Sequence, residues 1–108
     1  MTEEDTLEAL QLTRTYVPKW GAYAWRNASG QRHREHGPAI EWADGSKEYF
    51  VNGRRHRTDG PAVEYSDGSK AWYFNDKLHR TDGPAVEWAD GTKQWFLNGK
   101  IKRKISQI

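Results

Sequence analysis

The chain has 108 residues, no cysteine and six tryptophans, and its mean hydropathy of -1.06 is strongly polar although 13% of its residues are aromatic. This length corresponds to one domain, the aromatic content argues against disorder, and the lack of cysteine excludes a disulfide framework, a zinc finger and a thiol nucleophile. The formal net charge of +2, from 17 basic and 15 acidic residues, is small for a strongly nucleic-acid-binding domain.

Residues 1–18 differ in composition from the rest of the chain. They are acidic and contain no long apolar run, so we expect no signal peptide and no transmembrane helix, and a cytoplasmic location. Thr2 and Asp5 resemble a capping box, which predicts a helix from about Glu3 to Thr15 that ends before Pro18. A helix of this length is marginal alone, so we expect it to dock on the remainder of the chain.

A unit of 23 residues then recurs along the chain. Gly-Pro appears at Gly37, Gly60 and Gly83, and a histidine, an Asp-Gly and an asparagine keep the same step. We divide residues 19–101 into a degenerate cap and three repeats, followed by a basic tail; the segments are 19–32, 33–55, 56–78, 79–101 and 102–108.

Asp-Gly and Asn-Gly between β-prone runs are strong hairpin signals, because both dipeptides tolerate the positive φ of a type I′ turn. Each repeat contains an Asp-Gly, and an Asn-Gly or Asn-Asp follows it, so each repeat should contribute two short strands. We therefore predict a mainly β fold: a meandering antiparallel single-layer sheet of repeated β-hairpins with one N-terminal α-helix.

Two-residue loops fix the expected register, with Trp42 opposite Lys47 and Val51 opposite Arg54. Alternation then separates two faces. The expected first face contains Ile40, Trp42, Tyr49, Val51, Val63, Tyr65, Trp72, Phe74, Val86, Trp88, Trp95 and Leu97. The expected second face contains Ala39, Glu41, Glu48, Phe50, Arg57, Ala62, Glu64, Ala71, Tyr73, Arg80, Ala85, Glu87, Gln94, Phe96 and Arg103.

The repeat resembles the MORN family over about residues 20 to 103. Residues 67–79 show its order of Asp-Gly turn, aromatic strand, Asn turn and basic residue before histidine. MORN repeats usually continue His-Gly-x-Gly, whereas this chain has His-Arg-x-Asp-Gly-Pro-Ala, a variant similar to phage and bacterial proteins, some of them antitoxin-like. The resemblance implies a scaffold or binding module.

No residue set indicates catalysis, a metal or a cofactor. The histidines His33, His56 and His79 should stand about 9–10 Å apart, too far to share one zinc ion, so we expect each to pack on the neighbouring aromatic strand. The glutamates and arginines of the second face (Glu41, Glu64, Glu87, Arg57, Arg80 and Arg103) form an expected solvated ion-pair network. Catalytic residues are normally unique, whereas these recur, so we predict that the protein is not an enzyme.

Protein binding is the predicted function. Aromatic residues that the helix leaves uncovered would anchor a partner, and we select Tyr65, Trp72, Phe74, Trp88 and Trp95. The resemblance implies a phage or bacterial inhibitor, anti-defence or antitoxin-like, that acts by steric blocking. The sequence leaves open a homodimer, a membrane-surface scaffold, and nucleic-acid binding through exposed rings and the basic residues Lys100, Lys102, Arg103 and Lys104.

Overall fold

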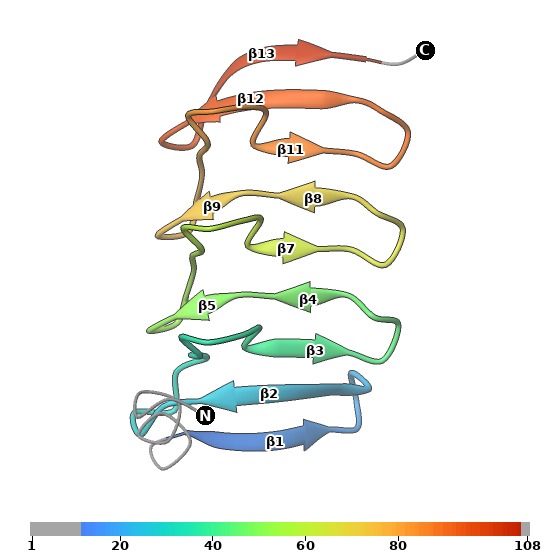
Figure 1. Ribbon diagram of the computed structural model, residues 1–108. Helices are drawn as coiled ribbons and strands as arrows, with labels where there is room; N and C mark the ends of the chain where they lie inside the picture. Colours follow the sequence, from blue (N-terminus) through green and yellow to red (C-terminus); the bar gives the residue numbers. More distant parts are fainter. Residues whose placement is uncertain (1–11, 107–108) are drawn as a thin grey trace.

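The protein is a ladder of short antiparallel strands in one layer (Figure 1). The computed structural model describes residues 12–106. Its strands are β1 (Thr13–Val17), β2 (Ala22–Arg26), β3 (Ile40–Trp42), β4 (Lys47–Glu48), β5 (Phe50–Val51), β6 (Arg54–Arg55), β7 (Val63–Glu64), β8 (Lys70–Ala71), β9 (Tyr73–Phe74), β10 (Lys77–Leu78), β11 (Val86–Glu87), β12 (Lys93–Leu97) and β13 (Lys100–Ile105). The mainly β prediction is confirmed.

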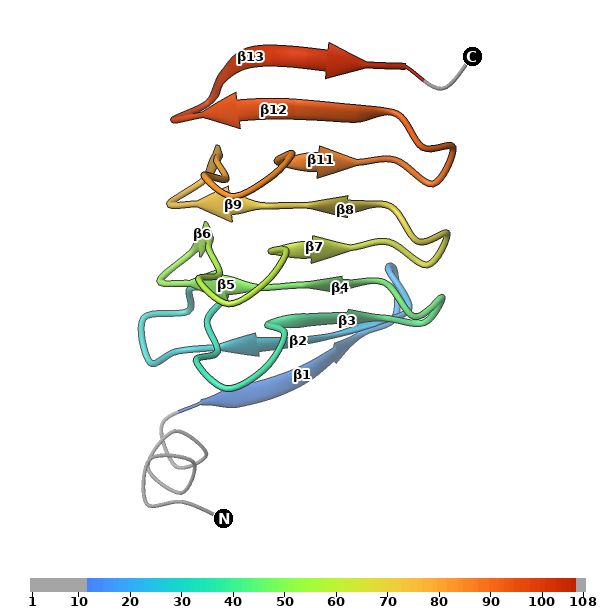
Figure 2. The ribbon, with the colours of Figure 1, turned by 45° about the horizontal axis from the view of Figure 1, so that its top comes forward.

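Nine of these strands form one sheet in the order β1-β2-β3-β4-β7-β8-β11-β12-β13. Each repeat adds two strands to it. The pairs β5-β6 and β9-β10 are separate two-stranded hairpins at the ends of the longer strands. The Asp-Gly turns line up along one edge of the ladder and the Asn turns along the other (Figure 1). Figure 2 shows that the segment that connects β6 to β7 lies on one side of the sheet.

The predicted N-terminal helix is wrong where the structure describes it. Residues Thr13–Val17 form strand β1, which pairs with β2 and sets Tyr16 opposite Tyr23. Alternating β-branched residues favour a strand here, and β2 supplies the backbone partners that an isolated short helix would lack. Residues 3–11 of the predicted helix lie outside the described part, and residues 12–106 contain no helix. Accordingly, no helix that could span a membrane is found within that range.

The Asn turns have the predicted geometry. Val51 pairs with Arg54, and the two loop residues between them have φ values of 49° at Asn52 and 81° at Gly53. These left-handed values define a type I′ turn. In the next repeat Asp76 occupies the glycine position with a φ of 69°.

The Asp-Gly turns are one residue longer than predicted. Lys47 pairs with Glu41 and not with Trp42, so three residues form the loop. The Gly45 N–H donates to the Trp42 carbonyl at 3.0 Å, and Gly45 has a φ of 94°. A turn that ends in a left-handed glycine is the usual three-residue hairpin with a bulge.

The aspartate side chains stabilise this longer turn. Asp44 Oδ1 accepts the Ser46 N–H at 2.8 Å, and Asp90 Oδ1 accepts the Thr92 N–H at 2.8 Å. These backbone hydrogen bonds hold the pKa of Asp44 and of Asp90 below the usual range. The contribution of each carboxylate to stability is therefore present at neutral pH and is lost as the pH falls through the lowered pKa.

The extra residue exchanges the two faces on the second strand of every hairpin. Direct cross-strand partners define the faces. The core face contains Ile40, Trp42, Glu48, Phe50, Val63, Tyr65, Ala71, Tyr73, Val86, Trp88, Gln94 and Phe96, and the arginine face contains Trp25, Glu41, Lys47, Tyr49, Glu64, Lys70, Trp72, Glu87, Lys93 and Trp95. The predicted single aromatic face is therefore wrong: Tyr65 and Trp88 lie opposite to Trp72, Phe74 and Trp95.

The core is thin and lies on the core face. One cluster contains Ala22, Ala39, Ile40 and Phe50, with Trp42 packed against it. A second cluster contains Val63, Ala71 and Val86, with Tyr73, Leu78 and Phe96 packed against it. Short side chains of the sheet are buried beneath larger ones that remain partly exposed, so a strongly polar chain can still fold around its aromatic residues.

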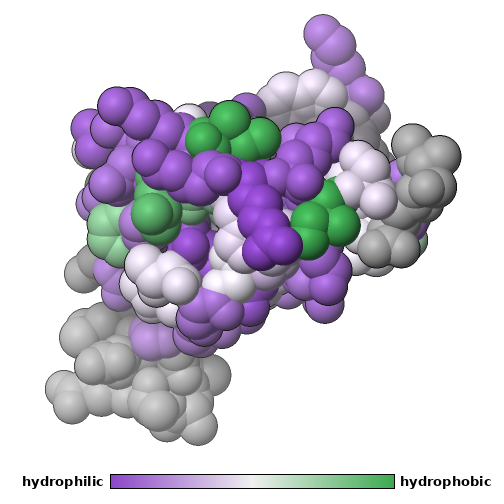
Figure 3. Space-filling model, turned by 90° about the horizontal axis from the view of Figure 1, so that it is seen from above, coloured by the Kyte–Doolittle hydropathy of each residue, from purple (hydrophilic) through white to green (hydrophobic). Residues whose placement is uncertain are grey.

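The basic residues treated as a C-terminal tail lie in strand β13. Lys100, Lys102, Arg103 and Lys104 are exposed on this edge strand, which pairs with β12. Seen from this end, the surface is mostly hydrophilic, with separate hydrophobic patches (Figure 3). Lysines on an edge strand oppose its pairing with another sheet.

A glycine substitution tests the corrected Asp-Gly turn. Gly68 has a φ of 95°, and a Cβ built there meets no atom within 4 Å, so only the backbone conformation opposes a side chain. We expect Gly68→Ala to lower the free energy of unfolding by about 1 kcal/mol and Gly68→Asn to lower it less, because asparagine tolerates left-handed conformations. Urea denaturation measures both variants, and equal losses would contradict this turn geometry.

Candidate functional site

In each segment that connects two repeats, one arginine side chain stacks on an aromatic ring and bonds back to the segment itself. We call this arrangement the arginine closure. The Arg57 guanidinium donates to Asp59 Oδ1, to the Pro61 carbonyl and to Glu64 Oε1, each at 3.0 Å. Its Cζ also lies 3.9 Å from the centre of the Tyr49 ring. The connecting segment is thereby attached to the strands before and after it.

The same arrangement recurs at the equivalent positions. Arg80 stacks on Trp72 at 3.9 Å and donates to Asp82 at 2.9 Å and to the Pro84 carbonyl at 3.1 Å. Arg34 stacks on Trp25 at 4.3 Å. On the edge strand, the Arg103 Cζ lies 5.2 Å from the Trp95 ring centre.

The ion pairs of these arginines are more buried than the predicted solvated network. The Arg57 side chain is 22% exposed and its Glu64 partner 34% exposed. Although burial acts to lower the pKa of Arg57, its bonds to Asp59 and Glu64 and its proximity to Tyr49 raise it overall. The guanidinium therefore stays charged, and its donors are engaged within the protein.

Grooves lie between successive connecting segments. The first has a volume of about 460 Å³ and is lined by Tyr49, Val51, His56 and the two flanking segments. The second has about 580 Å³ and contains Trp72 and His79 at equivalent places. The arginines that line both grooves are already paired, and the described residues contain no cluster of metal-ligating side chains.

Each repeated histidine joins the start of its own repeat to the Asn turn near the end of that repeat. His56 Nδ1 accepts the Asn75 N–H at 3.1 Å, and His79 Nδ1 accepts the Asn98 N–H at 3.0 Å. His33 binds the Asn52 N–H in the same way at 2.9 Å. Each histidine holds the Asn turn of its own repeat, so it has a structural role.

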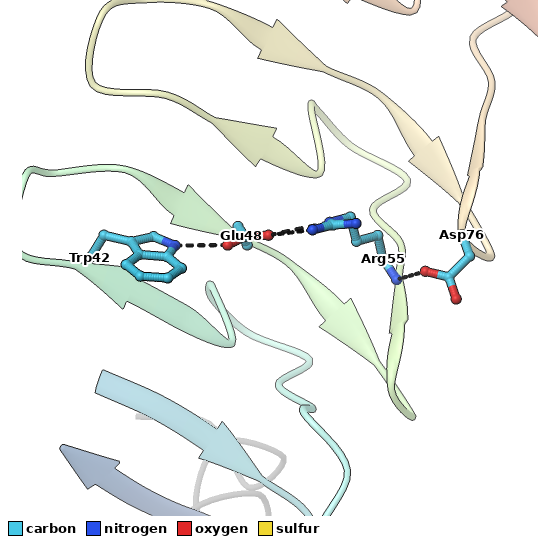
Figure 4. Close-up of polar contacts among 4 residues, drawn as sticks. All are labelled: Trp42, Glu48, Arg55 and Asp76. Atoms are coloured by element: carbon cyan, nitrogen blue, oxygen red, sulfur yellow. Dashed lines mark hydrogen bonds and ion pairs between the residues drawn. The ribbon is translucent and has the colours of Figure 1, made fainter. Parts of the chain in front are cut away.

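A chain of polar contacts links three residues of the first repeat to Asp76 of the second (Figure 4). The Trp42 indole N–H donates to Glu48 Oε2 at 2.7 Å, and Arg55 donates to Glu48 Oε1 at 3.0 Å. The Arg55 backbone N–H then donates to Asp76 Oδ1 at 2.7 Å. The equivalents of Glu48 are Ala71 and Gln94, so this buried carboxylate is unique among the repeats.

Four aromatic rings remain on the core face beside the Asp-Gly turns, and we call them the ring row: Trp20, Trp42, Tyr65 and Trp88. Trp20 and Trp42 are in contact, with ring centres 6.0 Å apart. Trp42, Tyr65 and Trp88 occupy one position of the 23-residue repeat. Tyr65 and Trp88 are each 46% exposed and Trp20 is 38% exposed.

Hydrogen bonds between neighbouring turns hold the ring row in place. Ser46 Oγ accepts the Ser66 N–H at 2.9 Å, and Ser69 Oγ accepts the Ala89 N–H at 2.8 Å. The Trp88 indole N–H donates to Gln94 at 3.0 Å. Bonds between adjacent repeats therefore fix the turns that carry the rings.

Tyr65 differs from the other rings of the row. Ala71 stands where Trp42 and Trp88 find an acceptor, and the Tyr65 hydroxyl has no hydrogen-bond partner among the described residues. Burial raises the pKa of Tyr65, so its hydroxyl remains a donor at neutral pH. The middle of the row thus offers one polar group to a ligand.

The residues predicted to form one binding site lie at three separate locations in the structure. Tyr65 and Trp88 belong to the ring row, whereas Trp72 and Trp95 lie beneath arginines on the arginine face. Phe74 packs beside His56, with ring centres 4.5 Å apart. Sequence reasoning did not select Trp20 and Trp42; for Trp42 the signal was present, because it shares a repeat position with Tyr65 and Trp88.

No protein-family model matches this chain, and no curated protein or solved structure matches it. The resemblance to MORN repeats therefore remains a prediction from the period and the turns.

A double-mutant cycle tests the arginine closure. A Cβ on Gly83 would lie 2.8 Å from Arg80 Cζ. We expect Gly83→Ala to lower the free energy of unfolding by about 1–3 kcal/mol through overpacking. In an Arg80→Ala background most of that loss should disappear, as urea denaturation would show. An unchanged loss would mean that the glycine serves the backbone alone.

The buried carboxylate provides a further prediction. Glu48→Ala leaves both the Trp42 indole and Arg55 without their acceptor, and we expect a loss of about 1–3 kcal/mol in thermal or urea unfolding. Glu48→Gln retains an acceptor for the indole and should lose less. Gln94→Ala is the matched control, because the bond from Trp88 is exposed; a loss as large as that of Glu48→Ala would contradict the role of burial.

Proposed function

We propose that the protein is a non-catalytic binding module whose ring row binds another protein. The observation that carries this proposal is the position of Trp20, Trp42, Tyr65 and Trp88, which are fixed by the fold and partly exposed along one line. Tryptophan and tyrosine dominate binding hot spots, because they bury a large area at little cost in conformational entropy.

The two faces support a binding surface at the ring row in preference to the arginine face. On the arginine face, Arg57 and Arg80 are engaged by their own repeats. Glutamates and lysines alternate across the strands, from Glu41 to Lys47 to Glu64 and onward. This face is internally neutralised. In the ring row Arg32 lies over Trp20 at 5.4 Å, whereas Tyr65 and Trp88 are exposed to about half of their surface in the described structure.

Nucleic-acid binding receives less support from this arrangement. Four exposed basic residues lie close together on β13 at one end of the sheet, whereas Asp44, Asp67 and Asp90 stand beside the ring row. Carboxylates at that place would repel phosphates. The rings lie across several repeats and are not gathered at this basic edge strand.

A module of this kind acts by occupying a surface of its partner. Burial of the ring row would exclude other ligands from the same surface, which agrees with the steric inhibitor, anti-defence or antitoxin-like, implied by the repeat variant. We place this activity in the cytoplasm, as expected from the lack of cysteine.

Site-specific photo-cross-linking tests the surface. A photoreactive phenylalanine analogue in place of Tyr65 or Trp88 should form an adduct with a partner in extracts of the native host, identified by mass spectrometry. Trp42→Ala should reduce the yield about tenfold or more, since loss of a hot-spot ring commonly costs that much affinity.

The same analogue in place of Trp72 or Phe74 is the matched control, because both residues are aromatic and lie away from the row. Thermal unfolding of every variant separates lost binding from lost folding. Equal adducts from both faces, adducts with nucleic acid, or adducts only with a second copy of this chain would overturn the proposal.

A further inference from the structure

We infer that the ring row binds a polyproline II segment that carries basic residues. This inference rests on the proposed function and names the chemistry of the partner. It depends on the spacing of the rings, on the Tyr65 hydroxyl and on the charge of the adjacent turns.

The spacing of the row matches one turn of a polyproline II helix. Trp42 is the last residue of β3, and Tyr65 and Trp88 directly follow β7 and β11; these strands are two apart in the sheet. Two strand spacings amount to about 9.4–9.8 Å. A polyproline II helix has three residues per turn and rises about 9.3 Å per turn. Every third residue of such a segment, laid across the strands, would therefore meet an equivalent ring.

Other regular segments fit this spacing less well. An extended strand presents side chains to one face about every 6.6 Å, which is out of step with the rings. A helix returns to the same face after seven residues, about 10.5 Å, and is displaced by about 2 Å after two steps. Aromatic rings in a groove are also the usual surface for proline-rich segments.

The centre of the row offers the polar contact that such a segment requires. A polyproline II backbone has unpaired carbonyl groups, and the Tyr65 hydroxyl is a donor without a partner in the described structure. A groove of about 400 Å³ lies next to this ring, between two consecutive Asp-Gly turns, with Asp44 and Ser66 in its lining. A ligand carbonyl above Tyr65 would satisfy this donor.

Charge complementarity favours basic residues in the ligand. Asp44, Asp67 and Asp90 follow the three rings by two residues, so one carboxylate accompanies each ring. Their acceptor bonds are to backbone N–H groups and to the Ser66 hydroxyl. Lysines also line the groove, but Lys47 and Lys70 stand opposite glutamates in the alternating ladder. The groove lining as a whole contains two acidic and two basic side chains, so the acidic contacts for a ligand would come from the aspartates that accompany the rings.

Synthetic peptides test the inference directly. A repeat of Pro-Pro-Arg, about twelve residues long, should bind the full-length protein and change its tryptophan fluorescence, with affinity measured by calorimetry. Pro-Pro-Glu of equal length tests the charge, and Gly-Ser-Arg tests the polyproline II conformation at equal charge. We expect each control to bind about tenfold more weakly or not at all, since charge complementarity and preorganisation both contribute.

Variants locate the site. Tyr65→Phe removes only the hydroxyl and should weaken Pro-Pro-Arg binding about threefold to tenfold, and Trp88→Ala should weaken it about tenfold or more. Phe74→Ala, an exposed ring away from the row, should not change it. Equal binding of Gly-Ser-Arg, or binding that is indifferent to Tyr65 and Trp88, overturns the inference.

The two proposals fail in different ways. If Tyr65 cross-links a protein partner but Pro-Pro-Arg does not bind, the polyproline inference fails and the binding module stands. If neither the peptide nor any partner engages the row, both fail. Cross-linking to a proline-rich basic segment, mapped by mass spectrometry, supports both.

Discussion

An arginine that stacks on a ring, donates to a proline carbonyl and pairs with a glutamate is the interaction on which this fold depends. A single-layer sheet has no second layer against which its connections can pack. Arg57 holds the connecting segment against the sheet, because its guanidinium stacks on Tyr49 of the preceding repeat and bonds to Glu64 on β7. The close approach of Arg80 to Gly83 shows why the segment contains glycine at a position that needs no left-handed φ.

This closure also decides which aromatic rings are covered and which stay exposed. The guanidinium groups and the connecting segments cover rings such as Trp72, so the aromatic residues of the arginine face serve the fold. On the core face the large side chains cover Ile40 and Val63, which are almost completely buried. In the described structure the rings beside the Asp-Gly turns extend past this thin core, and in the repeats they recur at every second strand.

The sequence allowed the repeat, the strand pairs and the Asn turns to be predicted, because these depend on local residues such as Asn52 and Gly53. It did not allow the face of each ring to be predicted. One extra loop residue at Gly45 exchanges the two faces on which the side chains of the second strand lie. The choice between a two-residue and a three-residue loop depends on the bond from Ser46 to Asp44, and Asp-Gly is compatible with both. The helix prediction failed at Thr13–Val17, where pairing with β2 outweighed local helical signals.

Within residues 12–106, the bonds between the three repeats join nearest neighbours. The Ser66 N–H donates to Ser46 and the Arg55 N–H donates to Asp76, each across one repeat boundary, whereas His56 accepts the Asn75 N–H within a single repeat. Stability in such an array is close to a sum of neighbour terms. An in-frame duplication of one unit would therefore preserve every type of contact and add one ring and one aspartate to the row. For the proposed binding surface, copy number in the gene would then set the valence, and avidity for an extended ligand would increase without any new type of contact.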